Sequence, residues 1–246
     1  LHLRGDNGEC RVRDLVPFVH QVGGHTGMMK YDEATVCKPV FPAELHFYEM
    51  LTPELAKFTP AFKGVVHVFV QEEDDGSLSV RAYPIRSQHQ TSTGPMYPSN
   101  GQVWVQTRQK KMTGKVPSCH SNKGQVLRSI ETLPEFILLE NLTSKFRSPC
   151  ILDVKLGTKT YHKDHSEAKR QLHIDRDAAT TTATLGLRLC GMQASKGSYK
   201  CRNKYDGRRL GKDGLRSALR EYFSTSDEVR MELLPPFIEK LEALLQ

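Results

Sequence analysis

The segment SPCILDVKLGTK, residues 148–159, places two charges inside a stretch that otherwise has the pattern of a buried strand. Successive side chains of a strand point to opposite faces, so Asp153, Lys155 and Gly157 share one face. The residues between them form an apolar set and predict a second face packed on a core: Leu152, Val154 and Leu156. The segment therefore constrains the fold to one that keeps these two faces in different surroundings.

Two interpretations of the charged face remain open. In the first, Asp153 and Lys155 line a site, and Gly157 lets a ligand or another backbone approach closely because it has no side chain. In the second, the segment is an amphipathic edge strand whose charges face water.

The bulk composition sets limits on the class of protein. A chain of 246 residues with 38% hydrophobic and 26% charged residues can form one large domain or two lobes around a real core. It has neither a run of about 18 apolar residues nor an apolar signal-peptide region, so we expect no membrane association. The six cysteines form no C-x-x-C pair, and we expect reduced thiols in a cytoplasmic or nuclear protein.

The net charge of +7 is concentrated in two stretches. Between Lys196 and Arg220, nine lysines and arginines face only Asp206 and Asp213, and a second basic stretch covers 145–176. Such clusters indicate a polyanionic partner, either nucleic acid or a highly phosphorylated small molecule, or else a basic face exposed to solvent. Few aromatic residues interrupt the first cluster, which disfavours nucleic acid.

Local patterns predict the elements of the first half of the chain. A Gly-rich turn at Gly23 and Gly24 precedes a hairpin, and a helix starts near Pro42. Most of 71–124 is rich in Ser, Gly, Pro, Thr and Gln and is expected to be a mobile insertion. The expected strands are 28–31, 35–38, 64–70, 78–82, 102–106 and, within 135–146, an apolar strand that ends in Glu140 and Asn141.

The second half of the chain is expected to be richer in helices. A helix capped by Asp164 or Ser166 would place Lys169, His173 and Arg176 on one stripe. Residues 182–193 have the pattern of a strand, and 213–223 that of an amphipathic helix. A last helix is expected to begin at a capping box formed by Thr225 and Glu228 and to be interrupted at Pro235 and Pro236.

At this point the residues support a family resemblance that extends over most of the chain. Pro149, Asp153, Lys155 and Gly157 match the P-x-x-x-D-x-K-x-G signature of the inositol polyphosphate kinases. Further blocks, in the same order along the chain, resemble the inositol hexakisphosphate kinase branch: PFVHQVGGHTGMMKYDEATVCKP, FYEMLTPELAKFTPAFKGVV, LLENLTSKF, TLGLRLCGMQ and CRNKYDGRRL.

The resemblance implies an α+β, two-lobe fold of the ATP-grasp or protein-kinase-like type. Residues 1–142 would form the ATP-binding lobe, including the insertion at 71–124, and 143–246 would form part of the C-terminal lobe. The implied activity is transfer of the γ-phosphoryl group of ATP to an inositol polyphosphate, with hexakisphosphate giving an inositol pyrophosphate. The implied cofactors are ATP and Mg²⁺, and the implied partner is the inositol polyphosphate substrate, with no role for nucleic acid or membrane.

The same resemblance implies roles for single residues. Asp153 would be the catalytic carboxylate and would also meet the nucleotide, and Lys155 would meet the transferred or a substrate phosphate. The residues implied in ATP binding are Lys38, oriented by Glu44 or Glu49, and the hinge residues Glu140, Asn141 and Leu142, which would meet adenine mainly through backbone groups. The residues implied in substrate binding are Lys155, Gly157, Lys159, Lys169, His173, Arg176, Lys204 and Arg208. From the residues alone, Lys38 and His173 also fit ordinary surface side chains.

Two departures from the family pattern bear on activity. Ala43 stands where a basic residue often precedes the first helical glutamate. The family pattern also continues into a Ser-Leu-Leu strand and a magnesium-binding Asp-Phe-Ala-His segment, which are not found before Gln246. If the chain ended there, we would expect weak or no catalysis, and an impaired relative that binds inositol polyphosphates or a protein is the alternative.

Overall fold

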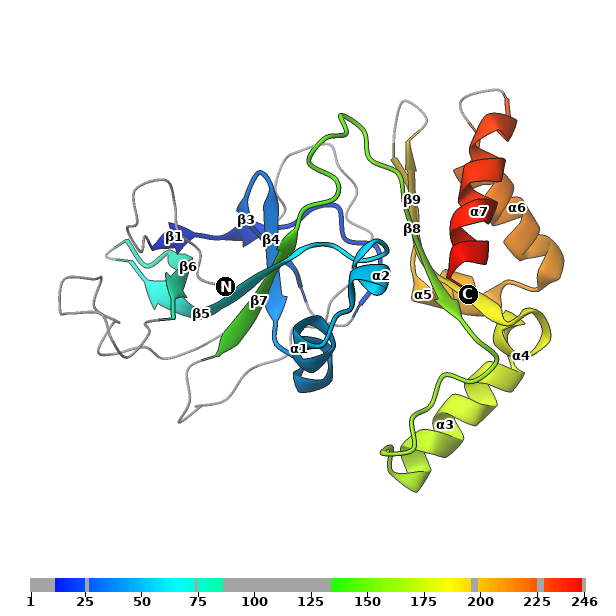
Figure 1. Ribbon diagram of the computed structural model, residues 1–246, viewed down its shortest axis with the longest axis horizontal. Helices are drawn as coiled ribbons and strands as arrows, with labels where there is room; N and C mark the ends of the chain where they lie inside the picture. The colour runs from blue at the N-terminus through cyan, green and yellow to red at the C-terminus, as the bar shows by residue number, and fades with distance from the viewer. Residues whose placement is uncertain are drawn as a thin grey trace. The chain divides into compact units, whose positions relative to one another are not determined.

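The structure, a computed structural model, describes residues 12–24, 27–73, 75–85, 134–195, 199–224 and 228–244. The chain divides into two compact units. Unit 1 holds the described residues up to Phe18 and those from Gly27 to Lys145, and unit 2 holds Val19–Gly24 and the described residues from Phe146 onward. Each unit combines a β-sheet with helices (Figure 1).

Unit 1 is built on an antiparallel sheet in which the described strands follow the order β1-β6-β5-β7-β4-β3-β2. The strands are β1 (Arg13–Asp14), β2 (Val16–Pro17), β3 (Met29–Asp32), β4 (Thr35–Pro39), β5 (Phe62–Glu72), β6 (Leu78–Pro84) and β7 (Glu135–Glu140). The strands expected at 28–31, 35–38, 64–70, 78–82 and within 135–146 are confirmed. The strand expected at 102–106 and most of the insertion expected at 71–124 lie outside the described residues.

Alternation along β4 and β7 gives this sheet two apolar faces. On one face, Cys37 and Leu138 pack in a cluster with Val66 and Val68 of β5. On the other face the cluster contains Val36, Ile137 and Leu139, with the partly buried Tyr48 against it. Tyr48 belongs to α1 (Pro42–Glu49), so this helix lies on the second face, and the short α2 (Pro53–Ala56) follows it.

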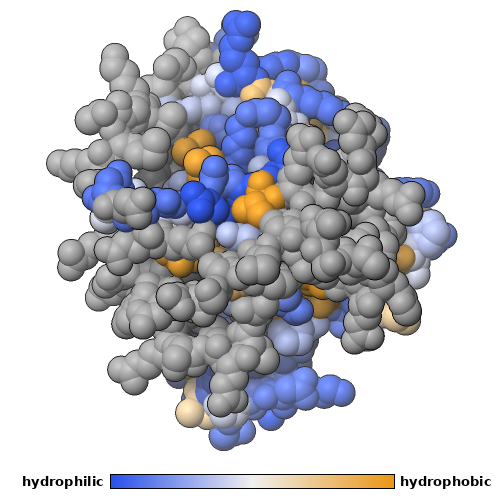
Figure 2. Space-filling model, turned by 90° about the vertical axis from the view of Figure 1, so that its left-hand side faces the viewer, coloured by the Kyte–Doolittle hydropathy of each residue, from blue (hydrophilic) through white to orange (hydrophobic). Residues whose placement is uncertain are grey.

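The outer surface of unit 1 carries apolar side chains as well. Val16 and Leu78 are more than half exposed. In the face turned to the viewer in Figure 2, the hydrophobic residues show as separate orange groups among hydrophilic ones. Singly exposed apolar residues of this kind are common on protein surfaces and need no special explanation.

Unit 2 is built on a smaller antiparallel sheet with the order β10-β9-β8. Its strands are β8 (Ile151–Leu156), β9 (Leu187–Ser195) and β10 (Tyr199–Arg202). Leu152 and Val154 pack with Leu189 of β9 and Leu215 of α6 (Lys212–Tyr222), which confirms the apolar face predicted for this segment, except that Leu156 is 56% exposed. The other helices are α3 (Glu167–Ala178), α4 (Thr181–Leu185), α5 (Lys204–Arg209), the 3-10 turn η1 (Met231–Leu233) and α7 (Leu234–Ala243).

The expected strand at 182–193 is partly wrong. Thr181–Leu185 is helix α4, and the strand begins only at Leu187. Gly186 lies between them in the left-handed conformation, with φ of 65°. Its N–H donates a hydrogen bond to the Thr182 carbonyl. Threonines favour strands by propensity, but here tertiary packing and a C-capping glycine override that preference.

The last helix also differs from expectation. Described residues from Glu228 to Arg230 are not helical, and Thr225 lies outside the described residues. Helix α7 starts at Leu234, so Pro235 and Pro236 lie in its first turn and do not interrupt it. The first turn tolerates proline because its N–H groups have no intrahelical acceptor.

The sequence predicted that all cysteines are reduced thiols, and this prediction is wrong for one of them. Cys37, Cys150 and Cys190 are free, but Cys201 of β10 is disulfide-bonded. Spacing along the chain did not reveal this bond because a disulfide depends on proximity in space. Burial raises the pKa of the Cys37 thiol to about 12, which keeps it protonated and unreactive. Among the described residues, no helix has the length and apolar character needed to span a membrane.

Candidate active site

The charged face of β8 is covered in part by the segment Val19–Gly24. Asp153 is half-buried and Lys155 is exposed. A methyl group added at Gly23 would lie 1.6 Å from Oδ2 of Asp153, so the carboxylate occupies the space that a side chain would need. Asp153 therefore does not simply face water, although β8 is an edge strand among the described strands of its sheet.

The same segment is fixed to the strand next to β8. Asp153 is paired with Gly191 of β9, where an added methyl group would lie 2.0 Å from the carbonyl oxygen of Val22. The His20 ring is 3.0 Å from Nε2 of Gln193, which also donates to the Pro149 carbonyl. Two glycines, at 23 and 191, thus allow the backbone of this segment to lie directly on the β8–β9 pair beside the acid.

Basic side chains from four elements, β8, α3, β9 and α5, influence one another on unit 2. The pKa of the Arg208 guanidinium is lowered by burial and then by the positive charges of Arg176 and Arg188. The pKa of His173 is lowered by burial and then by Arg176, His165 and Lys155, with Asp177 acting in the opposite direction. In the part of the chain that the structure describes, neither Arg176 nor Arg208 has a carboxylate partner. We call Lys155, His173, Arg176, Arg188 and Arg208 the cationic cluster.

A partly buried hydrogen-bond network joins two members of the cationic cluster, His173 and Arg188, to Thr160, Asp177 and Thr180. Thr160 donates its N–H to Oδ2 of Asp177 and its hydroxyl to Oδ1, each at 2.7 Å, and the Thr160 hydroxyl is also 3.0 Å from Nδ1 of His173. Nη1 of Arg188 lies 3.7 Å from Oδ1 of Asp177 and donates to Oγ1 of Thr180. The network ties the loop after β8 to α3 and to β9.

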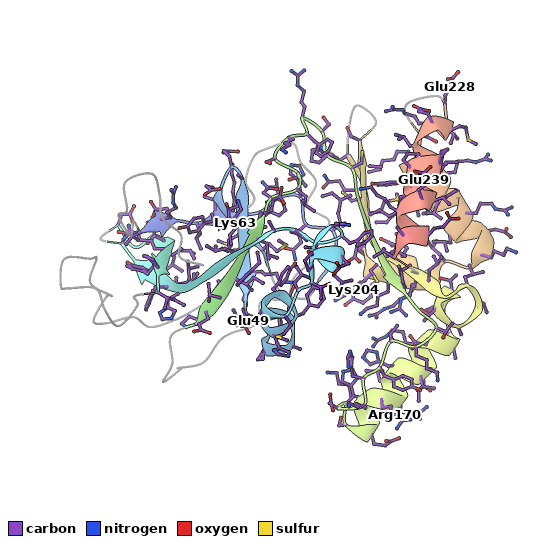
Figure 3. All side chains as sticks on the ribbon, in the orientation of Figure 1. Glu49, Lys63, Arg170, Lys204, Glu228 and Glu239 are labelled. Carbon is purple, nitrogen blue, oxygen red and sulfur yellow. The ribbon has the colours of Figure 1, made fainter. Side chains whose placement is uncertain are left out.

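The predicted substrate residues differ in how the structure places them. Four of them are linked by their charges, since Lys155 and Arg176 lower the pKa of His173 and Arg176 lowers that of Arg208. Gly157 follows β8 with φ of 103°, a conformation that glycine favours. Lys159 and Lys169 are exposed, and Lys204 lies 5.5 Å from the centre of the Tyr205 ring. Figure 3 shows Lys204 in unit 2 and Arg170 on α3, where Arg170 lies over the ring of Tyr161.

Sequence reasoning missed the residues that organise the cluster. Asp177 is four residues after His173 on the predicted helix, and Arg188 alternates with Leu187 and Leu189 on the predicted strand. Both spacings were signals that could have found them. The partnership of Thr160 with Asp177 had no such signal because it joins a loop to a helix.

The predicted ATP lysine is ion-paired within unit 1. Lys38 is on the same face of β4 as Val36, which is the face covered by α1, and its Nζ lies 2.7 Å from Oε1 of Glu44. Both side chains remain about one-quarter exposed. Of the two acids proposed to orient Lys38, it is Glu44 that does so, while Glu49 is exposed near the end of α1 (Figure 3).

The predicted hinge residues are held mainly by their own unit. The N–H groups of Glu140 and Asn141 donate to the carbonyls of Ala61 and Ala34. The buried Asn141 side chain donates to the Glu33 carbonyl and accepts from Thr143. Leu142 is 56% exposed. Asn141 thus braces the turn after β7, and its amide groups are already used.

The acids of the site suit a metal ion only if a ligand supplies further oxygens. The described residues include no group of three or more His, Cys, Asp or Glu side chains arranged to hold a metal. A Mg²⁺ ion bound by nucleotide phosphates needs only one or two carboxylates from the protein. Asp153 is a carboxylate of that kind on β8.

Unit 1 carries an ion-paired lysine on its sheet, and unit 2 carries a strand acid and two arginines without a carboxylate partner among the described residues. These are features of phosphotransferases that act on anionic small molecules. The inositol polyphosphate kinase family model matches residues 136–246. Human inositol hexakisphosphate kinase 1 is 33% identical over 303 aligned positions, which cover 98% of this chain and 68% of that protein. Human inositol hexakisphosphate kinase 3 is 32% identical over 309 positions, covering 98% and 74%.

The fold has a counterpart among solved structures. The crystal structure of inositol phosphate multikinase Ipk2 from S. cerevisiae, in complex with ADP and Mn²⁺, matches with a TM-score of 0.53. The match covers 86% of this chain and 67% of that chain at 21% sequence identity. This chain belongs to the inositol polyphosphate kinase family, and its α+β fold is that of an inositol phosphate kinase. The expected enzyme class, a kinase that uses ATP, is confirmed with it.

Proposed function

We propose that this protein transfers the γ-phosphoryl group of ATP to inositol hexakisphosphate and forms an inositol pyrophosphate. The cationic cluster is the observation on which the substrate proposal rests. Arg176 and Arg208 have no carboxylate partner among the described residues, and keeping such charges close together is unfavourable until an anion joins them. The names of the relatives that match nearly the whole chain point to the same substrate.

We propose that unit 2 binds the inositol polyphosphate. Arginine binds phosphate oxygens through two parallel N–H bonds, whereas lysine acts as a point charge. Arg176 and Arg208 would hold phosphates in this way, and Lys155 would meet the phosphate that reacts. Lys159, Lys169 and Lys204 remain proposed contacts for the outer phosphates, together with the close approach that Gly157 permits.

We propose that unit 1 binds the nucleotide. Lys38, held by Glu44, would pair with the ATP phosphates, as an ion-paired lysine does in other phosphotransferases. Since the N–H groups of Glu140 and Asn141 already donate within the unit, the adenine contact would pass through Leu142 and the Glu140 carbonyl. The Asn141 side chain would take no part in this contact, because it braces the turn after β7.

Asp153 would act on the reacting oxygen. In the proposed transfer, a substrate oxygen forms a bond to the γ-phosphorus, the bond from that phosphorus to the β–γ bridging oxygen breaks, and ADP leaves. Asp153 would orient the attacking oxygen, and Lys155 would stabilise the negative charge on the phosphoryl group. A Mg²⁺ ion, which Asp153 would help to hold, supplies neutralisation of phosphate charge when bound.

The proposal is tested by incubating the protein with Mg-ATP and inositol hexakisphosphate and resolving the products by ³¹P NMR. We expect a pyrophosphate signal on the inositol product, formed together with an equal amount of ADP. Asp153→Asn should abolish the signal without changing the unfolding temperature. Binding of inositol hexakisphosphate without turnover would contradict the enzyme proposal and support a binding module, and turnover of less phosphorylated inositols alone would contradict the substrate.

A further inference from the structure

The Thr160 hydroxyl is the centre of a network in which the position of each proton can be assigned. A threonine hydroxyl has a single proton to donate. The carboxylate of Asp177 can only accept, so the 2.7 Å contact from Oγ1 to Oδ1 uses that proton. The 3.0 Å contact between Oγ1 of Thr160 and Nδ1 of His173 then requires the proton to be on Nδ1.

The assignment fixes the tautomer of His173. A neutral imidazole has one N–H, so a proton on Nδ1 leaves Nε2 with a free lone pair. Because Nδ1 is turned toward Thr160, Nε2 is turned away from it. The hydrogen bond from Nδ1 therefore orients the ring, and Nε2 remains available to bind a proton.

Asp177 anchors this arrangement from a buried position. The side chains of Asp177 and Arg188 are only 6% and 5% exposed. Asp177 also accepts the Thr160 N–H, so it holds both the backbone and the hydroxyl of this residue. Displacing Asp177 would leave Arg188 buried without its ion-pair partner, which is costly.

The groups around His173 determine when Nε2 takes a proton. Arg176 and Asp177 are on its own helix, Lys155 is on β8, and His165 is in the preceding loop with its ring centre 5.0 Å away. Three of these four neighbours are basic. Burial and these positive charges lower the pKa of His173, and an anion bound among them would raise it.

We propose that Thr160 and Asp177 are positioning residues that hold His173 as the Nδ1–H tautomer, so that Nε2, once protonated from solvent, donates a hydrogen bond to a substrate phosphate. The inference deepens the proposed function by assigning His173 a switchable phosphate contact. It also gives Thr160, a residue with no expected role, a part in substrate recognition. The hydrogen bond from protonated Nε2 to the phosphate is charge-assisted, and it forms only when the substrate is bound.

The tautomer is tested by ¹⁵N NMR of the histidine rings of the whole chain, with inositol hexakisphosphate as the probe. His173 is assigned by loss of its signals in His173→Gln. We expect the Nδ1–H form at pH 8 without ligand, and a rise of about one unit in the pKa of His173 when the probe is added. A ring protonated on Nε2 in the free protein, or a pKa that the probe leaves unchanged, would overturn the proposal.

The positioning role is tested by Thr160→Val, which removes the hydroxyl and keeps the branched shape. We expect the Nδ1–H preference to be lost and the KM for inositol hexakisphosphate to rise about tenfold, the worth of one hydrogen bond to a charged group, with the KM for ATP unchanged. Thr160→Ser should restore both properties. An equal rise of both KM values, or no rise in either, would overturn the proposal.

Thr184→Val is the matched control. Thr184 is exposed on α4, has no side-chain hydrogen bond among the described residues, and undergoes the same change of shape and polarity. It should leave the His173 spectrum and both KM values as they are. The NMR measurements need no turnover, so a protein without kinase activity that still shows the expected tautomer and pKa shift would refute the proposed function alone.

Discussion

Gly23 limits the position of Asp153 more directly than any other glycine near β8. A methyl group there would lie 1.6 Å from Oδ2 and 2.7 Å from Cγ of the acid. Contacts under about 3 Å do not occur between such atoms, so either the carboxylate or the segment Val19–Gly24 would have to move. The carboxylate of Asp153 can therefore hold its position only if residue 23 has no side chain.

Gly23→Ala should lower kcat at least tenfold because it displaces the carboxylate by more than a few tenths of an ångström. The KM for ATP should change by a smaller factor than kcat, since Lys38 and Glu44 in unit 1 are untouched. Steady-state kinetics with varied ATP would measure both. Gly27→Ala is the control, because nothing lies within 4 Å of the added methyl group, and it should leave kcat unchanged. Equal kinetics for the two variants would show that Asp153 is not constrained by residue 23.

The Lys38–Glu44 pair gives a second prediction for single residues. Glu44→Gln should raise the KM for ATP several-fold, because the charge that aligns Lys38 at 2.7 Å is removed. Glu49→Gln makes the same chemical change on the same helix at an exposed position and should have no effect (Figure 3). A larger effect from Glu49→Gln than from Glu44→Gln would show that Glu49, and not Glu44, orients Lys38.

Among the elements, α5 shows how local capping supports the cationic cluster. Asn203 accepts from the N–H groups of Tyr205 and Asp206, and Asp206 accepts from the Asn203 N–H at 2.9 Å. This capping box fixes the start of the short helix that presents Arg208. The pKa of Asp206 is lowered by the hydrogen bond from the Asn203 backbone and then by Arg209.

Asp206→Ala should reduce the free energy of unfolding by about 1 kcal/mol at pH 7. The folded pKa is depressed, so the contribution of the carboxylate is present above its unfolded pKa near 3.8 and is lost as pH falls through the folded value. Urea unfolding at pH 7 and at pH 3 should therefore show the difference from the parent protein shrinking in acid. Asp213→Ala, in the first turn of α6 without a side-chain bond among the described residues, should cost less at pH 7. A difference that grows in acid would contradict the role of the carboxylate.

Most of the described elements could be predicted from sequence because their signals are local. The alternation of β8 and the serine cap of α3 are examples, and Ser166 does accept from the Lys169 N–H. The errors arose where tertiary context decides: the threonines of α4 have strand propensity, and the prolines of α7 could equally break or begin a helix. At the site, sequence patterns placed the cations but not the bonds of Thr160 and Asp177 that hold them.

For the molecule as a whole, the unpaired charges of unit 2 should make stability depend on anions. A ligand that binds only the folded state stabilises it by about 2.7 kcal/mol at a concentration one hundred times its Kd. Inositol hexakisphosphate should therefore raise the midpoint of thermal unfolding by several degrees at low salt, and by less at 0.5 M salt because charges are screened.

Arg176→Gln should reduce this thermal shift by at least half. Arg230→Gln removes the same charge from unit 2 at an exposed position paired with Glu232, and should leave most of the shift in place. Differential scanning calorimetry of both variants with and without the probe separates site binding from a general effect of net charge. Equal losses in the two variants would indicate only the general effect.

The assignment of Val19–Gly24 to unit 2, while the residues on both sides belong to unit 1, has a consequence for biosynthesis. These residues leave the ribosome long before β8 and β9 have been translated, since synthesis proceeds from the N-terminus. Val22 can pack on Gly191 only after β9 has been synthesised, and until then this segment lacks the surface on which it packs. Unit 2 can therefore be completed only after β8 and β9 have been synthesised, when a segment made much earlier packs against them.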